Sequence, residues 1–209
     1  MATQLRKPYV TPYAEDNLDL PPAFEWADGS RQLTYHDALP QKWMFGALWA
    51  HCGTARKGKI QWHLVHTLRQ RRCMLKQRCR VCGEPATDPD TGRVPWIMPS
   101  EPAGGLRSTM TTAHPPTCKA HIGEALATCP HLRREPPVVC TVGDSFPIAV
   151  LANVYGEDDG GRLVETAHQV PIGLDEFHLL GRVLATQLIV CVEDLRPEPL
   201  TAGLNLLLP

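Results

Sequence analysis

The chain lacks any long apolar run, and this excludes one broad class of protein. A helix needs about 20 apolar residues to span a bilayer, and every apolar stretch of the chain is shorter than this. The first residues also lack the basic and then apolar pattern of a secretion signal. We therefore expect no membrane partner and a cytoplasmic location.

Acidic residues are missing from one long stretch. No Asp or Glu lies between Asp37 and Glu84, although this stretch carries ten basic residues. From Thr141 to the last residue the balance reverses, with ten carboxylates against three arginines, so the net charge of −1 hides a strong segregation. This asymmetry indicates an anionic partner for residues 56–80, either nucleic acid or an acidic protein surface. The alternative is that the basic and acidic parts neutralise each other within the fold.

The basic residues crowd most densely just before residue 80. Phosphates attract such a surface with an affinity that depends on salt and tolerates many sequences. Trp62 lies nearby in the sequence and could stack on a partner. The residues that we expect to bind an anion are Arg69, Arg71, Arg72, Lys76, Arg78 and Arg80.

The composition is that of a folded protein with many loops. Hydrophobic residues make up 43% of the 209 residues, close to the globular norm, so wholesale disorder is not expected. The 20 prolines and 16 glycines indicate many turns and loops. The length fits one large domain or two small ones.

The eight cysteines are the most informative residues of the chain. Cys79 and Cys82 are separated by two residues, and Cys118 and His121 repeat this spacing further along. Thiolate and imidazole are ligands that zinc prefers, and the spacing lets one turn of backbone direct both ligands of a pair at one ion. Gly83 suits the tight turn after such a pair. The sequence therefore predicts zinc bound by these four side chains, in a reducing compartment.

The order of elements around these residues resembles a treble-clef zinc finger. The cysteine pair would form a knuckle, residues 93–98 a strand, and residues 119–128 a helix that begins with the second pair. The resemblance covers residues 79–134 and implies a local fold and a zinc ion, but no particular activity. More widely, residues 66–72, 79–82, 115–118 and 129–134 together resemble an uncharacterised family of GC-rich filamentous bacteria and their mobile elements, which would make the protein bacterial or phage.

Two alternatives concern the metal site itself. We favour a closed site with four protein ligands, which contributes stability only. A catalytic zinc would instead have three protein ligands and a water molecule. Cys129 or His131 could also replace one of the four ligands, because both follow His121 closely in the sequence.

Other sites are weaker hypotheses. A metal-dependent nuclease of the treble-clef type would need a pair such as His114 and Glu124, although their order differs from the expected one. A second metal site could form if His63 and His66 shared a helix face near the His51-Cys52 pair. We identify no catalytic residue.

The hydrophobic patterns predict an α+β fold. We expect strands over residues 32–35, 44–52, 93–98, 138–142, 146–155 and 163–170, with helices over residues 61–78, 119–128 and 174–188. Residues 189–192 fit either a helix or a strand. The chain would then consist of an irregular arm (1–30), a strand and basic helix (31–78), a zinc-binding segment (79–135) and a mixed C-terminal portion (136–209).

The function expected from the sequence is that of a non-enzymatic, zinc-stabilised binding or adaptor protein. A metal-dependent hydrolase is the alternative from a different class. A third hypothesis is a structural component of a larger bacterial or phage complex, in which the proline-rich arm would dock.

Overall fold

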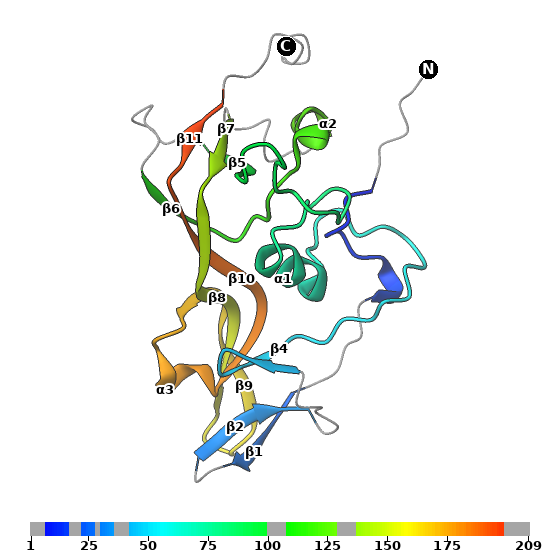
Figure 1. Ribbon diagram of the computed structural model, residues 1–209. Coiled ribbons are helices and arrows are strands. Elements are labelled where there is room, and N and C mark those ends of the chain that lie inside the picture. Colours follow the sequence, from blue (N-terminus) through cyan, green and yellow to red (C-terminus); the bar gives the residue numbers. More distant parts are fainter. Residues whose placement is uncertain are drawn as a thin grey trace. The chain divides into compact units, whose positions relative to one another are not determined.

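The computed structural model describes residues 7–16, 22–27, 30–35, 42–99, 108–128 and 137–198 (Figure 1). It divides into two compact units, which we call unit 1 and unit 2. Unit 1 comprises residues 1–10, 72–146 and 190–209, and unit 2 comprises residues 11–71 and 147–189. Three elements run from one unit into the other: α1 (Thr67–Leu75), β8 (Asp144–Glu157) and β10 (Val183–Glu193).

The fold is α+β, with mostly strands and few helices, so the expected class is confirmed. Among the described residues, no helix has the length and apolar character needed to cross a membrane.

Unit 2 begins with two short hairpins. β1 (Ala23–Ala27) pairs antiparallel with β2 (Ser30–Thr34), and β3 (Trp43–Met44) pairs antiparallel with β4 (Ala47–Trp49). The single strand expected over residues 44–52 is therefore wrong. Phe45 and Gly46 both have positive φ, 56° and 76°, as a two-residue hairpin turn requires, and this turn reverses the chain.

The strands of unit 2 follow the order β3-β4-β10-β8-β9. β9 (Leu163–Gly173) runs antiparallel to β8, and β4 runs parallel to β10. The strands expected over residues 146–155 and 163–170 are therefore present. A core cluster of Leu33, Tyr35 and Leu48 forms in this unit. Partly buried side chains that pack on it are Phe24, Trp43, Tyr155, Leu163 and Leu184.

The amphipathic helix expected over residues 174–188 is wrong. A four-residue helix, α3 (Phe177–Leu180), is followed directly by β10. The leucine spacing of four residues misled the prediction, because it is compatible with a helix face and with a strand. Burial alternates along the end of β10, where Leu188, Val190 and Val192 are buried and Ile189 and Cys191 are half-buried. Residues 189–192 are thus part of a strand.

The helix expected over residues 61–78 is shorter in the structure, where α1 spans Thr67–Leu75. His66 acts as its N-terminal cap, since Nδ1 of the ring accepts a hydrogen bond from the backbone N–H of Arg69 (3.4 Å). The other ring nitrogen, Nε2, lies 2.9 Å from the carbonyl oxygen of Gly53. Burial and the nearby Arg69 guanidinium lower the pKa of His66, so the ring is neutral and Nε2 donates to Gly53.

Asp16 is the centre of a buried polar cluster in unit 2. Its side chain is fully buried and pairs with the guanidinium of Arg69 (Nη2 to Oδ2, 3.0 Å). It also accepts hydrogen bonds from the backbone N–H groups of Tyr13 (3.0 Å) and Arg56 (2.9 Å). Asp16 therefore joins the N-terminal segment, the loop before α1 and α1 itself. Part of the expected irregular arm is in this way fixed in the core.

Unit 1 contains a three-stranded sheet in which β7 (Pro137–Val142) lies between β5 (Val94–Pro99) and β11 (Arg196–Pro197) (Figure 1). Both pairings are antiparallel. The strands expected over residues 93–98 and 138–142 are therefore confirmed. β6 (Thr109–Thr112) pairs antiparallel with the last residues of β10. A 3₁₀ turn, η3 (Lys119–His121), leads into α2 (Ile122–Thr128), so the helix expected over residues 119–128 is present.

Replacement of Asp16 by Ala should destabilise the protein by about 3–5 kcal/mol, because it leaves the buried guanidinium of Arg69 without its counter-charge. Urea denaturation measures this loss. Glu15→Gln is the matched control, since Glu15 is an exposed neighbouring carboxylate. Equal stability of the two variants would contradict the role given to Asp16.

The same contacts predict a dependence on pH. Burial acts to raise the pKa of Asp16, but hydrogen bonds from Tyr13 and Arg56 and the charge of Arg69 outweigh it, so the pKa is lowered. The stabilisation from ionised Asp16 is complete above the pKa of an Asp in the unfolded chain, about 3.9. It is lost as the pH falls through the lower pKa that Asp16 has in the folded protein. The wild type should therefore lose more of its stability than the Ala variant does between about pH 5 and pH 2.

Candidate metal centre

Unit 1 brings four potential metal ligands to one place. Cys79 and Cys82 lie in the loop after α1, Cys118 precedes η3, and His121 ends it. The ligand atoms of these four side chains all lie within 4.8 Å of one another. No other group of three or more His, Cys, Asp or Glu side chains among the described residues is arranged to hold a metal ion.

The first pair sits in a tight turn that the backbone closes. The N–H of Gly83 donates to the carbonyl oxygen of Cys79 (2.8 Å), and the N–H of Cys79 donates to that of Glu84 (2.8 Å). The N–H of Val81 points to the sulfur of Cys79 (3.4 Å). Arg78 donates from Nη1 to the carbonyl oxygen of Gly83 (2.8 Å). The turn therefore holds its cysteines in place with its own backbone and one arginine.

Gly83 is required in this turn for two reasons. Its φ of +80° lies in the left-handed region that favours glycine. A Cβ at this position would lie 2.8 Å from Cδ2 of Tyr9, because the tyrosine ring packs directly on the glycine. Tyr9 is held there by a hydrogen bond from its N–H to the carbonyl oxygen of Val81 (2.9 Å). This use of the N-terminal segment was not predicted, since no local pattern marks the contact.

The second pair is positioned by the start of a helix. Cys118 has extended backbone (φ −63°, ψ 152°), and its carbonyl oxygen accepts the N–H of His121 (2.9 Å). The N–H of Arg80 donates to the carbonyl oxygen of Pro116 (2.8 Å), which ties this segment to the cysteine turn. The two ligand pairs therefore meet through backbone hydrogen bonds as well as through the ligand atoms.

The separation of two of the sulfurs suits a tetrahedral ion. The sulfurs of Cys82 and Cys118 are 4.0 Å apart, and Nδ1 of His121 lies 3.0 Å from the sulfur of Cys118. Two sulfurs that each lie about 2.3 Å from a tetrahedral zinc are separated by about 3.8 Å. Three sulfurs and one imidazole nitrogen are also a usual ligand set for structural zinc. The four residues therefore form a zinc-like site.

The thiols differ in their readiness to ionise. Burial acts to raise the pKa of Cys79, but hydrogen bonds from the N–H groups of Cys82, Cys118 and Val81 outweigh it, and the pKa is lowered. Burial and the neighbouring Cys79 raise the pKa of Cys82 and raise that of Cys118 to about 12. One thiolate is thus stabilised by the backbone, whereas the other two thiols need a cation nearby before they lose their protons.

An ion pair between a half-exposed lysine and a buried carboxylate supports the second ligand segment. Lys119, next to Cys118, pairs with the carboxylate of Asp88, and this bond from the ammonium lowers the pKa of Asp88 to about 2. Asp88 also accepts hydrogen bonds from the N–H groups of Asp90 (2.9 Å) and Thr91 (3.1 Å). The turn before β5 is therefore connected to the start of η3.

The strands between the two ligand pairs do not form a hairpin with each other. β5 pairs with β7, and β6 pairs with β10. The treble-clef arrangement expected from the sequence is therefore not confirmed among the described residues.

The alternative sites from the sequence have different outcomes. Cys129 and His131 lie outside the described residues. His114 is exposed and Glu124 is half-buried, and they are not brought together as metal ligands among the described residues. The same holds for the proposed second metal site: His66 is buried against Gly53, whereas His63 precedes α1 and is exposed.

The six basic residues nominated for anion binding divide into two groups. Arg69 and Arg71 belong to unit 2 and are buried. Arg69 pairs with Asp16, and the guanidinium of Arg71 lies 4.4 Å from the ring centroid of Trp49. In unit 1, Arg72 and Lys76 are exposed, while Arg78 and Arg80 are half-buried. The anion-binding surface proposed below therefore omits Arg69 and Arg71.

Comparison with models of protein families, with characterised proteins and with solved structures found no match for this chain. The wider family resemblance therefore stays a prediction.

Metal removal should unfold the centre of unit 1. Structural zinc contributes on the order of 10 kcal/mol to small zinc-binding folds. We expect one zinc per chain by elemental analysis, and a lower melting temperature after treatment with a strong chelator. Cys118→Ala should abolish stoichiometric metal binding, whereas Cys191→Ala should retain it, because Cys191 lies on β10 outside the four-residue group. Full metal content in Cys118→Ala would contradict the site.

Gly83→Ala should cost more than Gly92→Ala. Both glycines have positive φ (+80° and +68°), so each substitution carries a backbone strain of about 1–2 kcal/mol. Only at residue 83 would the added Cβ also meet the Tyr9 ring, whereas nothing lies within 4 Å at residue 92. Urea denaturation and zinc content should therefore separate the two variants. In a Tyr9→Ala background the difference should shrink, and an unchanged difference would refute the proposed contact.

Proposed function

We propose that the protein is a zinc-stabilised binding protein whose partner is nucleic acid. The observation that carries this proposal is the group of four ligand atoms within 4.8 Å, because four protein ligands in one place support a structural ion. Four protein ligands complete a tetrahedral zinc and leave no open position for a substrate. A structural zinc therefore fits better than a catalytic one. The zinc would hold the cysteine turn against the helix start, in the manner of a treble clef.

The exposed basic residues support an anionic partner. In unit 2, Arg56, Lys57 and Lys59 are exposed on the loop before α1. Trp62 follows closely and is 55% exposed, which leaves its ring free to stack on a base. Basic side chains beside an exposed aromatic ring are the usual composition of a surface that binds single strands.

In unit 1, the second set of basic residues adjoins the metal centre in sequence. Arg72 and Lys76 are exposed on α1 and the residues after it, and they make no ion pair with another described residue. Arg78 and Arg80 flank Cys79, so a zinc ion there would fix the backbone that carries them. The proposed surface comprises Arg72, Lys76, Arg78 and Arg80 of unit 1, while Arg56, Lys57 and Lys59 form a second basic set within unit 2.

The acidic C-terminal part has partners of its own. Asp194 pairs with Arg93 and Arg196, and Glu198 lies 3.9 Å from Lys119. These contacts lie outside the basic stretch of residues 56–80. They support an external anion as the partner of the exposed basic residues of that stretch, whereas the buried Arg69 is neutralised internally by Asp16.

A cytoplasmic location fits the same proposal. Zinc ligation needs cysteines in the reduced state, and the described cysteines form no disulfide with one another. A bacterial or phage origin stays an expectation from the sequence.

Binding to a labelled single-stranded oligonucleotide should be measurable by fluorescence anisotropy and should weaken steeply as salt is raised. The affinity of the Arg72→Ala, Lys76→Ala double variant should be about 10-fold or more lower at low salt, because two phosphate contacts are lost. The affinity of this variant should also depend less on salt than that of the wild type. Arg162→Ala, Arg182→Ala is the matched control, because both arginines are exposed and lie outside the basic stretch.

Three outcomes would decide between the partners. Equal loss in the two double variants would show that the effect is one of net charge and would refute the proposed surface. Absence of binding at low salt would refute the nucleic-acid partner and leave an acidic protein surface. Stoichiometric purification with another protein, without affinity for nucleic acid, would favour the role of an assembly component.

A further inference from the structure

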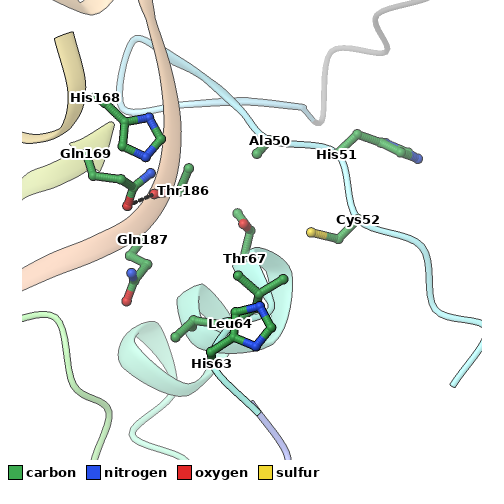
Figure 2. A pocket seen from close by; sticks show the side chains of 11 residues that line it. Ala50, His51, Cys52, His63, Leu64, Thr67, His168, Gln169, Thr186 and Gln187 are labelled. Atoms are coloured by element: carbon green, nitrogen blue, oxygen red, sulfur yellow. Dashed lines mark hydrogen bonds between the residues drawn. The ribbon is translucent and has the colours of Figure 1, made fainter. Parts of the chain in front are cut away.

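A pocket of about 670 Å³ lies within unit 2, whereas the four metal ligands belong to unit 1 (Figure 2). Its walls come from residues 50–52 after β4, residues 63–67 at the start of α1, and residues 168–169 and 186–187 on β9 and β10. The volume falls within the range of about 300–1,000 Å³ that is typical of small-molecule sites. Neither the metal centre nor the proposed nucleic-acid surface accounts for this pocket.

The lining is mixed polar and apolar and contains no carboxylate among its described residues. Three histidines, two glutamines, two threonines and a cysteine supply hydrogen-bonding groups, and Ala50, Leu64 and Val65 supply apolar area. A ligand that fits such walls accepts hydrogen bonds and also has an organic part.

Part of the polar lining is already satisfied, and part of it is free. The hydroxyl of Thr186 shares its one proton between the carbonyl oxygen of Leu151 (2.9 Å) and Oε1 of Gln169 (3.2 Å). The side chains of Thr67, Gln187 and His63, by contrast, have no hydrogen-bond partner among the described residues. Figure 2 shows Thr67 between Leu64 and Cys52, with the sulfur of Cys52 directed toward it and the ring of His51 directed away. The free donors therefore come from two different walls.

Arg71 places an uncompensated positive charge beside these walls. It is one helical turn after Thr67 on α1, it stacks on Trp49, which precedes Ala50, and its charge interacts with Cys52. The residue is only 9% exposed, and its Nη1 has no hydrogen-bond partner among the described residues. A buried arginine is normally paired with a carboxylate, because an unpaired buried charge is costly. An anion in the adjacent pocket would offset that cost.

Two further charges act on the pocket, with opposite signs. The start of α1 at Thr67 contributes the partial positive charge of a helix N-terminus. Glu165 contributes a negative charge, since its Oε1 lies 2.8 Å from Nδ1 of His168. This pairing occupies Nδ1 of His168, so the negative charge of Glu165 lies next to that wall of the pocket.

We propose that this pocket binds a small organic phosphate. The phosphate accepts hydrogen bonds from Thr67, Gln187 and His63, and its charge is balanced by Arg71 and the start of α1. Three oxygens accept several donors at once, which suits this lining better than the two oxygens of a carboxylate. The organic part contacts Ala50, Leu64 and Val65. This site shares no residue with the proposed nucleic-acid surface and does not depend on it.

Isothermal titration calorimetry of the zinc-loaded full chain tests the proposal. The probes are uridine monophosphate, glycerol phosphate, inorganic phosphate, uridine and acetate. Both phosphate esters should bind more tightly than inorganic phosphate, and uridine and acetate should not bind. Thr67→Val and Gln187→Leu should each weaken binding of the esters by about 10-fold, as the loss of one hydrogen bond to a charged group predicts.

His63→Ala and His178→Ala form a matched pair of variants, because both histidines are exposed and only His63 lines the pocket. His63→Ala should weaken ester binding, and His178→Ala should not. Since both positions are exposed, neither variant should fail to fold, and circular dichroism checks this. Equal affinities in this pair, no heat with either ester, or binding of uridine as tight as that of its phosphate would overturn the proposal. The Arg72→Ala, Lys76→Ala variant should bind the esters like the wild type, which separates this site from the nucleic-acid surface.

Discussion

The convergence of three thiols and one imidazole on a single point is the constraint on which unit 1 depends. The segments that carry these ligands have little regular structure: one is a turn between α1 and β5, and the other is a proline-containing loop before η3. Backbone hydrogen bonds align the two segments, yet two of the thiols remain hard to ionise without a cation. A bound metal would remove that difficulty and lock both segments together.

In unit 2, irregular segments are held together by a buried carboxylate. There Asp16 collects a guanidinium and two backbone N–H groups, and it thereby joins three segments that are far apart in the sequence. A fully buried carboxylate is acceptable only because each of these donors is in place. The two units thus differ in how they hold irregular segments: unit 1 has a zinc-like group of thiols and an imidazole, and unit 2 has a charged hydrogen-bonded cluster.

The basic residues of one stretch contribute both to the stability of the fold and to the proposed functions. In the stretch without acidic residues, Arg69 is buried in the core of unit 2 and Arg71 stacks on the ring of Trp49. The remaining basic residues of this stretch are exposed or half-buried. The same composition therefore serves stability, a proposed phosphate pocket and a proposed nucleic-acid surface. Burial decides which of these roles each arginine has.

The sequence by itself determined the four metal ligands, because two-residue spacing and ligand chemistry are local properties. It also determined β5, β7, β8 and β9, whose apolar patterns are long enough to be read locally. It failed for residues 174–188, since leucines spaced by four fit a helix and a strand equally well, and only pairing with neighbouring strands selects the strand.

Only the tertiary structure decided that Tyr9 packs on Gly83, that Asp16 pairs with Arg69, and that a pocket forms between α1, β9 and β10. Each of these features joins residues that lie far apart in the chain. No local pattern encodes such contacts, because they exist only once distant segments have been brought together.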